Sequence, residues 1–102
     1  MGRARRPQPA RLASKLREIR TKLDLSQQKM AERLSSQKNN VRPGHISDYE
    51  LGKRAPSLEV LLMYSRLAGV YLDALVDDSI RLPDKLPAVA KYEWALSRVH
   101  RR

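Results

Sequence analysis

The sequence predicts an all-α protein built from five short helices. Apolar residues recur at three- and four-residue steps in several segments, and no segment shows the two-residue alternation of a strand. Serine, proline and glycine, which commonly begin or end helices, stand between these segments. With 102 residues the chain has room for one modest core, so we expect a single domain.

The first two helices are predicted from apolar stripes on one side of each segment. Their members are Leu12, Leu16, Ile19 and Leu23 in the first and Met30, Ala31 and Leu34 in the second. Ser26 is well placed to cap the start of the second helix.

A polar loop at 35–42 separates the second helix from a short third one. Pro43 fits the first helical position and favours an extended Arg42 before it. Ile46 and Tyr49 are three residues apart and are expected to face inward, and Gly52 is placed to end the helix in a left-handed conformation.

The fourth helix is predicted over 57–68, between a Ser57 cap and a Gly69 stop. The stretch "LEVLLMYSRLA" is apolar on almost every side, so this helix is either central to the core or shared with a partner. The stretch "YLDALVDD" predicts a short fifth helix, and its three aspartates (Asp73, Asp77 and Asp78) are interpreted as a solvated acidic face.

The two ends of the chain lack the pattern of a packed core. Residues 1–11 carry four arginines and two prolines and are predicted to be a flexible basic arm. Residues 79–102 are predicted to be a linker with two prolines followed by a C-terminal tail, in which "AVAKYEWALSRVHRR" would form a last, loosely held helix.

The net charge of +10 is concentrated in one half of the chain. Residues 1–54 hold 14 Lys/Arg and 5 Asp/Glu, which gives +9, whereas residues 55–102 hold 7 and 6, which gives +1. This asymmetry favours a polyanionic partner, and nucleic acid more than an anionic membrane or an acidic protein. A charge that serves only solubility is the alternative interpretation.

Several classes of function are disfavoured. There is no cysteine, so disulfides and cysteine-based zinc sites are excluded, and no apolar run approaches the length of a membrane span. The N-terminus lacks the apolar segment of a secretory signal, so a reducing cytoplasm is the default. His45 and His100 are too far apart in sequence to suggest a metal site. No catalytic motif is present, and we expect no enzyme activity and no cofactor.

Three segments together resemble the phage-repressor and Cro-type helix-turn-helix family, also called the XRE family. They are "LSQQKMAERL" (25–34), "ISDYELGKRAPSLEVLL" (46–62) and "LAGVYLDALV" (67–76). The resemblance covers residues 12–78. It implies a five-helix, lambda-repressor-like DNA-binding domain that acts as a transcription regulator on double-stranded DNA.

The third helix is the expected reading element. Ala31 is small where a second helix crosses closely, and Ile46 and Tyr49 would anchor the helix so that its first turn enters a major groove about 12 Å wide. The resemblance implies that five residues contact the bases: Pro43, Gly44, His45, Ser47 and Asp48. Asp48 is unusual on a face that meets phosphates, and it either accepts from a cytosine amino group or points away.

The resemblance also implies phosphate contacts and one structural ion pair. Gln27, with Gln28 beside it, would bind a phosphate at the start of the second helix, where the helix dipole favours an anion. Lys53 and Arg54 would form a second phosphate clamp. Arg20 and Glu50 match a family pair that ties the first helix to the third.

The turn between the second and third helices departs from the family. It is about five residues longer than the common spacing, by comparison with the family's tight turn. We hypothesise that its added residues form a second reading element, with Lys38 on a phosphate and Asn39, Asn40 and Arg42 on bases. A loop that adds only diffuse charge is the alternative.

We therefore predict a cytoplasmic, nucleoid-associated bacterial or phage-type DNA-binding regulator that acts as a homodimer. The candidate dimer surfaces are Val60, Met63, Tyr64 and Leu67, or the tail at Tyr92–Trp94. The alternative is a protein-interaction module, such as an antitoxin or bridging factor, in which 57–68 or the C-terminal tail binds a partner and DNA contacts are secondary.

Overall fold

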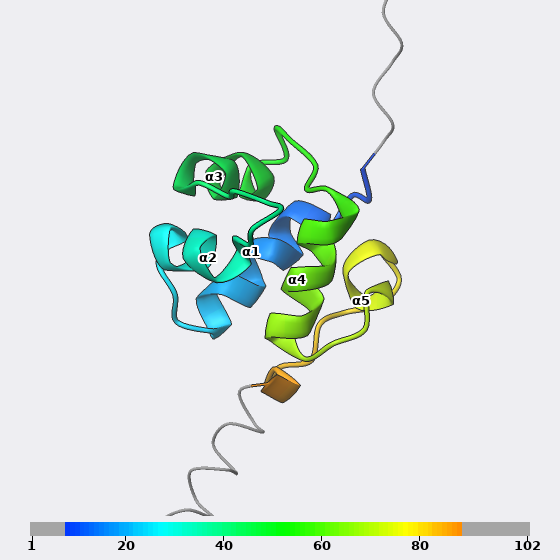
Figure 1. Ribbon diagram of the computed structural model, residues 1–102. Helices are drawn as coiled ribbons and strands as arrows, with labels where there is room; N and C mark the ends of the chain where they lie inside the picture. Colours follow the sequence, from blue (N-terminus) through cyan, green and yellow to red (C-terminus); the bar gives the residue numbers. More distant parts are fainter. Residues whose placement is uncertain (1–7, 89–102) are drawn as a thin grey trace, which may run out of the picture.

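The computed structural model describes residues 8–88, which form five helices and contain no strand. The helices are α1 (Leu12–Lys22), α2 (Gln27–Leu34), α3 (Pro43–Glu50), α4 (Leu58–Ala68) and α5 (Asp73–Val76). The all-α prediction is confirmed. In Figure 1, α2 and α3 lie at one side of the molecule, α1 and α4 occupy the middle, and α5 lies at the other side.

The predicted helix starts are confirmed. The Ser26 hydroxyl accepts the Lys29 backbone N–H at 3.1 Å at the start of α2, and the Ser57 hydroxyl accepts the Val60 N–H at 3.2 Å at the start of α4. Pro43 is the first residue of α3, and Arg42 before it is extended.

Two glycines end helices in the left-handed conformation, as predicted. Gly52 follows α3 with φ +74°, and Gly69 follows α4 with φ +78°. Gly69 is required for a second reason, because a Cβ at this position would lie 2.7 Å from the backbone nitrogen of Ala88. The chain beyond α5 therefore returns to the end of α4.

Every helix contributes to one core. The largest fully buried side chains come from all five helices and the segment that follows them: Tyr64, Leu16, Ile19, Met30, Leu34, Ile46, Leu75 and Leu86. Val60 and Tyr64 are buried within one copy of the chain, so the prediction that they belong to a dimer surface is wrong. The other candidate surface, Tyr92–Trp94, lies outside the described residues, as does the predicted helix in the tail.

The segment after α5 belongs to the packed domain and contacts the end of α1. Leu82 and Leu86 are buried in the core, so the segment predicted as a linker contributes to the domain. The Lys22 ammonium donates to the Pro83 carbonyl at 2.8 Å. Lys15, only 4% exposed, donates to the Ala74 and Asp77 carbonyls at 2.7 and 2.9 Å, which places a cation at the C-terminal end of α5.

The Asp78 carboxylate holds the chain just before α1. It accepts the backbone N–H groups of Ala10 and Arg11 at 2.9 and 3.0 Å, where α1 has no side-chain cap from its own residues. Asp73 and Asp77 are exposed, as interpreted from the sequence, whereas Asp78 is half-buried and has this structural role in addition. Of the predicted basic arm, residues 1–7 lie outside the described residues.

Candidate nucleic-acid interface

Helix α3 is anchored by one side and presents the other. Ile46 and Tyr49 are 0% and 6% exposed and pack into the core between α1 and α2. The five residues of α3 that were predicted to read bases lie at the surface: Pro43 and Gly44 are exposed, and His45, Ser47 and Asp48 are half-buried. These two buried side chains attach one side of the short helix to the core.

The first turn of α3 is fixed by His45. Its Nδ1 atom accepts the Arg42 backbone N–H at 3.1 Å, so the neutral ring carries its hydrogen on Nε2. This bond is the half of a capping box in which the third helical residue accepts the backbone N–H of the N-cap residue. It leaves Nε2–H as the donor with which His45 can contact a base.

The turn after α3 brings two cations back toward the helix. The Asp48 carbonyl accepts the backbone N–H groups of Lys53 and Arg54 at 2.9 and 3.4 Å. Both of these residues are exposed. Their positions directly beyond α3 are thus set by the backbone of the helix itself.

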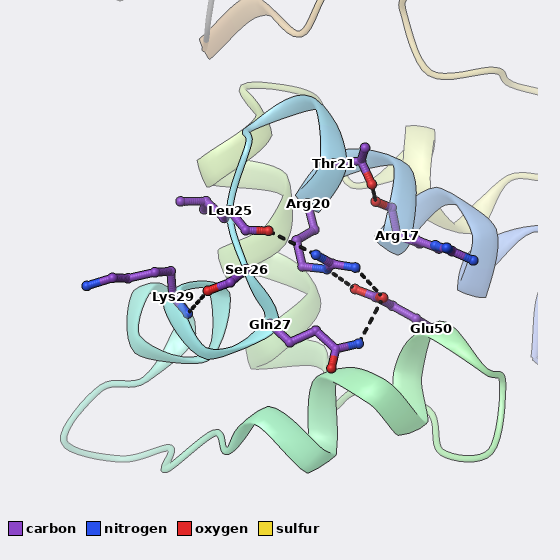
Figure 2. A network of polar contacts seen from close by, with 8 residues as sticks. All are labelled: Arg17, Arg20, Thr21, Leu25, Ser26, Gln27, Lys29 and Glu50. Carbon is purple, nitrogen blue, oxygen red and sulfur yellow. Dashed lines mark hydrogen bonds and ion pairs between the residues drawn. The ribbon is translucent and has the colours of Figure 1, made fainter.

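Arg20 and Glu50 form a bidentate ion pair between α1 and α3 (Figure 2). Arg20 Nε and Nη2 donate to Glu50 Oε2 and Oε1 at 2.6 and 3.0 Å, and Nη1 donates to the Leu25 carbonyl at 2.9 Å. The hydrogen bond to Glu50 raises the pKa of the Arg20 guanidinium, against the opposing effect of burial. The pair joins α1, α3 and the turn that enters α2.

Gln27 extends this network from the start of α2. Its side-chain amide points toward Glu50 and donates to Oε1 at 3.4 Å, a long hydrogen bond (Figure 2). Gln28, beside it, is exposed. The amide of Gln27 is therefore only weakly engaged.

One basic residue at this junction was not singled out from the sequence. Arg17 lines a shallow hollow whose walls come from α1, the start of α2 and the end of α3: Arg17, Arg20, Gln27, Ser47, Glu50 and Leu51. Arg17 lies one helical turn before Arg20, and this spacing is the signal that could have identified it.

The long turn at 35–42 is closed by its own hydrogen bonds. The Ser35 hydroxyl accepts the Val41 N–H at 3.0 Å, and Ser36 and Asn39 exchange backbone hydrogen bonds at 2.8 and 3.2 Å. Val41 is buried, so the turn is attached to the core at this point.

The predicted reading residues of this turn do not share one environment. The Asn39 amide donates to the Glu59 carboxylate at 2.9 Å, at the start of α4. Lys38, Asn40 and Arg42 are exposed. The structure thus ties Asn39 to α4 and leaves the other three at the surface.

The comparisons agree with this architecture. A family model described as helix-turn-helix matches residues 16–75, more than half of the chain. No curated protein matches the sequence. Within the described residues, no helix has the length and apolar character needed to cross a membrane. The match begins within α1, ends within α5 and includes the ion pair and α3, so the chain belongs to the Cro/repressor-type (XRE) helix-turn-helix family of DNA-binding proteins.

Proposed function

We propose that this protein is a transcription regulator that reads a specific double-stranded DNA sequence with α3 in the major groove. The observation that carries the proposal is the anchoring of α3 by Ile46 and Tyr49, which leaves its first turn at the surface. His45 would donate from Nε2 to a base acceptor such as guanine O6 or N7, and Asp48 would accept from a cytosine amino group. Pro43 and Gly44 allow the backbone to approach the bases closely.

Phosphate contacts on either side of α3 would supply most of the affinity. Gln27 and Gln28 stand at the start of α2, where a helix favours an anion. Lys53 and Arg54 stand beyond the end of α3. This assignment agrees with the charge of +9 on residues 1–54.

The long turn would add a second reading element beside α3. The bond from Asn39 to Glu59 fixes the turn against α4, and the exposed Lys38, Asn40 and Arg42 are then available to DNA. Deletion of 37–41 is a poor test, because Val41 belongs to the core. The substitutions Asn40→Ala and Lys38→Ala are better, and under the proposal the first changes the selected DNA sequence whereas the second weakens binding uniformly.

A homodimer on a pseudo-palindromic site is the expected assembly. One short helix reads only a few base pairs, too few to single out an operator among roughly 10⁶ or more competing genomic sites. The half-sites would lie about 34 Å apart, one helical turn of DNA. Sedimentation with selected DNA tests this, and a single protein chain per duplex contradicts it.

A salt titration on duplex DNA tests the proposal in general. A dimer should show a log–log slope of about −4 to −8, at roughly 0.9 per phosphate contact. A slope near zero would reject DNA binding through the basic half of the chain.

The rival function, a protein-interaction module, has support on the outer side of α4. Leu58 and Leu62 are one turn apart and are 75% and 39% exposed, whereas the other large apolar residues of this helix are at least partly buried. A stoichiometric second protein that co-purifies from the native host, and is lost with Leu58→Ser, would favour the rival. A specific DNA fragment recovered with the protein would favour the regulator.

A further inference from the structure

The hollow at the junction of α1, α2 and α3 contains donors that have no acceptor. Within residues 8–88, the Arg17 guanidinium and the Ser47 hydroxyl take part in no side-chain hydrogen bond or ion pair. The Gln27 amide makes one long bond of 3.4 Å and keeps a second N–H. Side chains from α1, α2 and α3 thus offer hydrogen-bond donors to the same hollow.

The backbone adds donors on the same side. The N–H groups of the first turn of a helix have no acceptor within that helix. At the start of α2 the Ser26 hydroxyl accepts only the backbone N–H of Lys29, so the backbone N–H groups of Gln27 and Gln28 remain without an acceptor in the helix. The positive end of the helix dipole therefore lies where the Gln27 side chain lines the hollow.

The charge of the hollow is positive although Glu50 forms part of its wall. Both oxygens of Glu50 are bound by Arg20, so the two charges offset each other. The charge of Arg17 is left over. A guanidinium presents two parallel N–H groups, a geometry that fits a phosphate.

We propose that this hollow binds one phosphodiester of the DNA that α3 reads. Arg17 contacts the phosphate oxygens from α1, Ser47 donates its hydroxyl from α3, and Gln27 donates from the start of α2. This inference rests on the proposed function and departs from the expectation drawn from the sequence at one residue, since it assigns Ser47 to the DNA backbone instead of a base. It also adds α1 to the DNA-binding surface.

The test compares Arg17→Ala with Arg66→Ala on a selected duplex and on an unrelated one. Arg66 is exposed in the last turn of α4 and does not line the hollow, so its removal changes the net charge equally. Arg17→Ala should weaken binding to both duplexes by about tenfold and reduce the salt slope by about 0.9. Arg66→Ala should leave the slope unchanged. Arg17→Lys keeps the charge without the paired N–H groups and should fall between wild type and Arg17→Ala.

Ser47→Ala separates the two roles of Ser47. A backbone contact leaves the sequence selected from a random duplex pool unchanged and weakens binding to all sequences equally, whereas a base contact changes the selected sequence. The proposal is overturned if Ser47→Ala changes that sequence, or if the slope with Arg17→Ala equals that with Arg66→Ala. Arg17 is exposed, so the Arg17→Ala variant should have the same melting temperature as the wild type.

Failure of the hollow and failure of the proposed function give different results. A wild-type protein that binds DNA with an Arg17-independent slope rejects the hollow alone. A wild-type protein that binds no duplex at any salt concentration rejects both.

Discussion

Arg20 and Glu50, 30 residues apart in sequence, are joined through both carboxylate oxygens at 2.6 and 3.0 Å. Their side chains are 18% and 5% exposed, so the pair lies at the edge of the core. It ties α3 to α1, and Arg20 also donates to the Leu25 carbonyl in the turn that enters α2. The orientation of α3 thus depends on a polar contact as well as on its two buried side chains.

Loss of this pair should destabilise the domain. Glu50→Ala leaves the Arg20 guanidinium partly buried without its partner, and we expect a loss of about 2–4 kcal/mol in the free energy of unfolding. Glu32→Ala is the matched control, because its ion pair with Lys29 is exposed and 3.6 Å long, and it should cost less than about 1 kcal/mol. Urea melts measure both. Equal losses in the two variants would contradict a structural role for Glu50.

The inward side of α3 should be distinguishable from its outer side. Ile46→Ala and Tyr49→Ala remove buried side chains and should cost about 2–5 kcal/mol in unfolding free energy. Ser47→Ala should stay within about 0.5 kcal/mol of wild type and weaken DNA binding. Thermal melts paired with binding titrations measure the two effects. A helix oriented the other way would exchange the behaviour of the two sets.

The start of α1 should become less stable in acid. Hydrogen bonds from the backbone N–H groups of Arg11 and then Ala10 lower the pKa of Asp78 from its ordinary value of 3.8. A carboxylate whose pKa is lowered by folding contributes stability above its unfolded pKa and loses it as the pH falls through the folded value. Stability contributed by Asp78 should therefore be complete near pH 7 and decline below about pH 4.

Asp78→Asn measures this contribution. The variant should be less stable than wild type at pH 7, and the difference should shrink as the pH falls below 4, because the wild-type carboxylate then also becomes neutral. Melting temperatures against pH give the comparison, with hydrogen exchange at Ala10 and Arg11 as a local measure. A difference between the two proteins that is constant with pH would show that the charge of Asp78 has no part in the contact.

The hydroxyl of Tyr64 should be dispensable for folding. The side chain is fully buried, its oxygen has no hydrogen-bond partner among the described residues, and burial raises the pKa of the phenol. An unpaired buried hydroxyl costs free energy, so Tyr64→Phe should leave stability unchanged or raise it by up to about 2 kcal/mol. Tyr71→Phe, at an exposed position, is the control. A loss above about 1 kcal/mol for Tyr64→Phe would show that this hydroxyl has a partner in the folded protein.

Local signals in the sequence predicted most helix boundaries. Ser26, Pro43 and Ser57 begin helices, and Gly52 and Gly69 end them, because capping and backbone conformation depend on a few neighbouring residues. These boundaries could therefore be predicted without knowledge of contacts between distant parts of the chain.

The contacts that were missed connect distant parts of the chain. A lysine in a helix is usually solvated, yet Lys15 of α1 is buried and its ammonium donates to carbonyl groups 59 and 62 residues later in the sequence. Asp78 likewise binds backbone 67 and 68 residues earlier. Helical periodicity gives no information on which segment will cover a helix, so the burial of Leu82 and Leu86 in the core could not be predicted from it.

The most direct test of the account is selection from a random pool of DNA duplexes by the wild type and by Asp48→Ala. Wild type should enrich a two-fold symmetric sequence, and Asp48→Ala should bind with similar salt dependence while losing the preference at one position of each half-site, because a base contact carries sequence information and a phosphate contact does not. If the wild type enriches no sequence at any salt concentration, or if Asp48→Ala and the other surface variants of α3 select the wild-type sequence unchanged, then α3 is not the reading element.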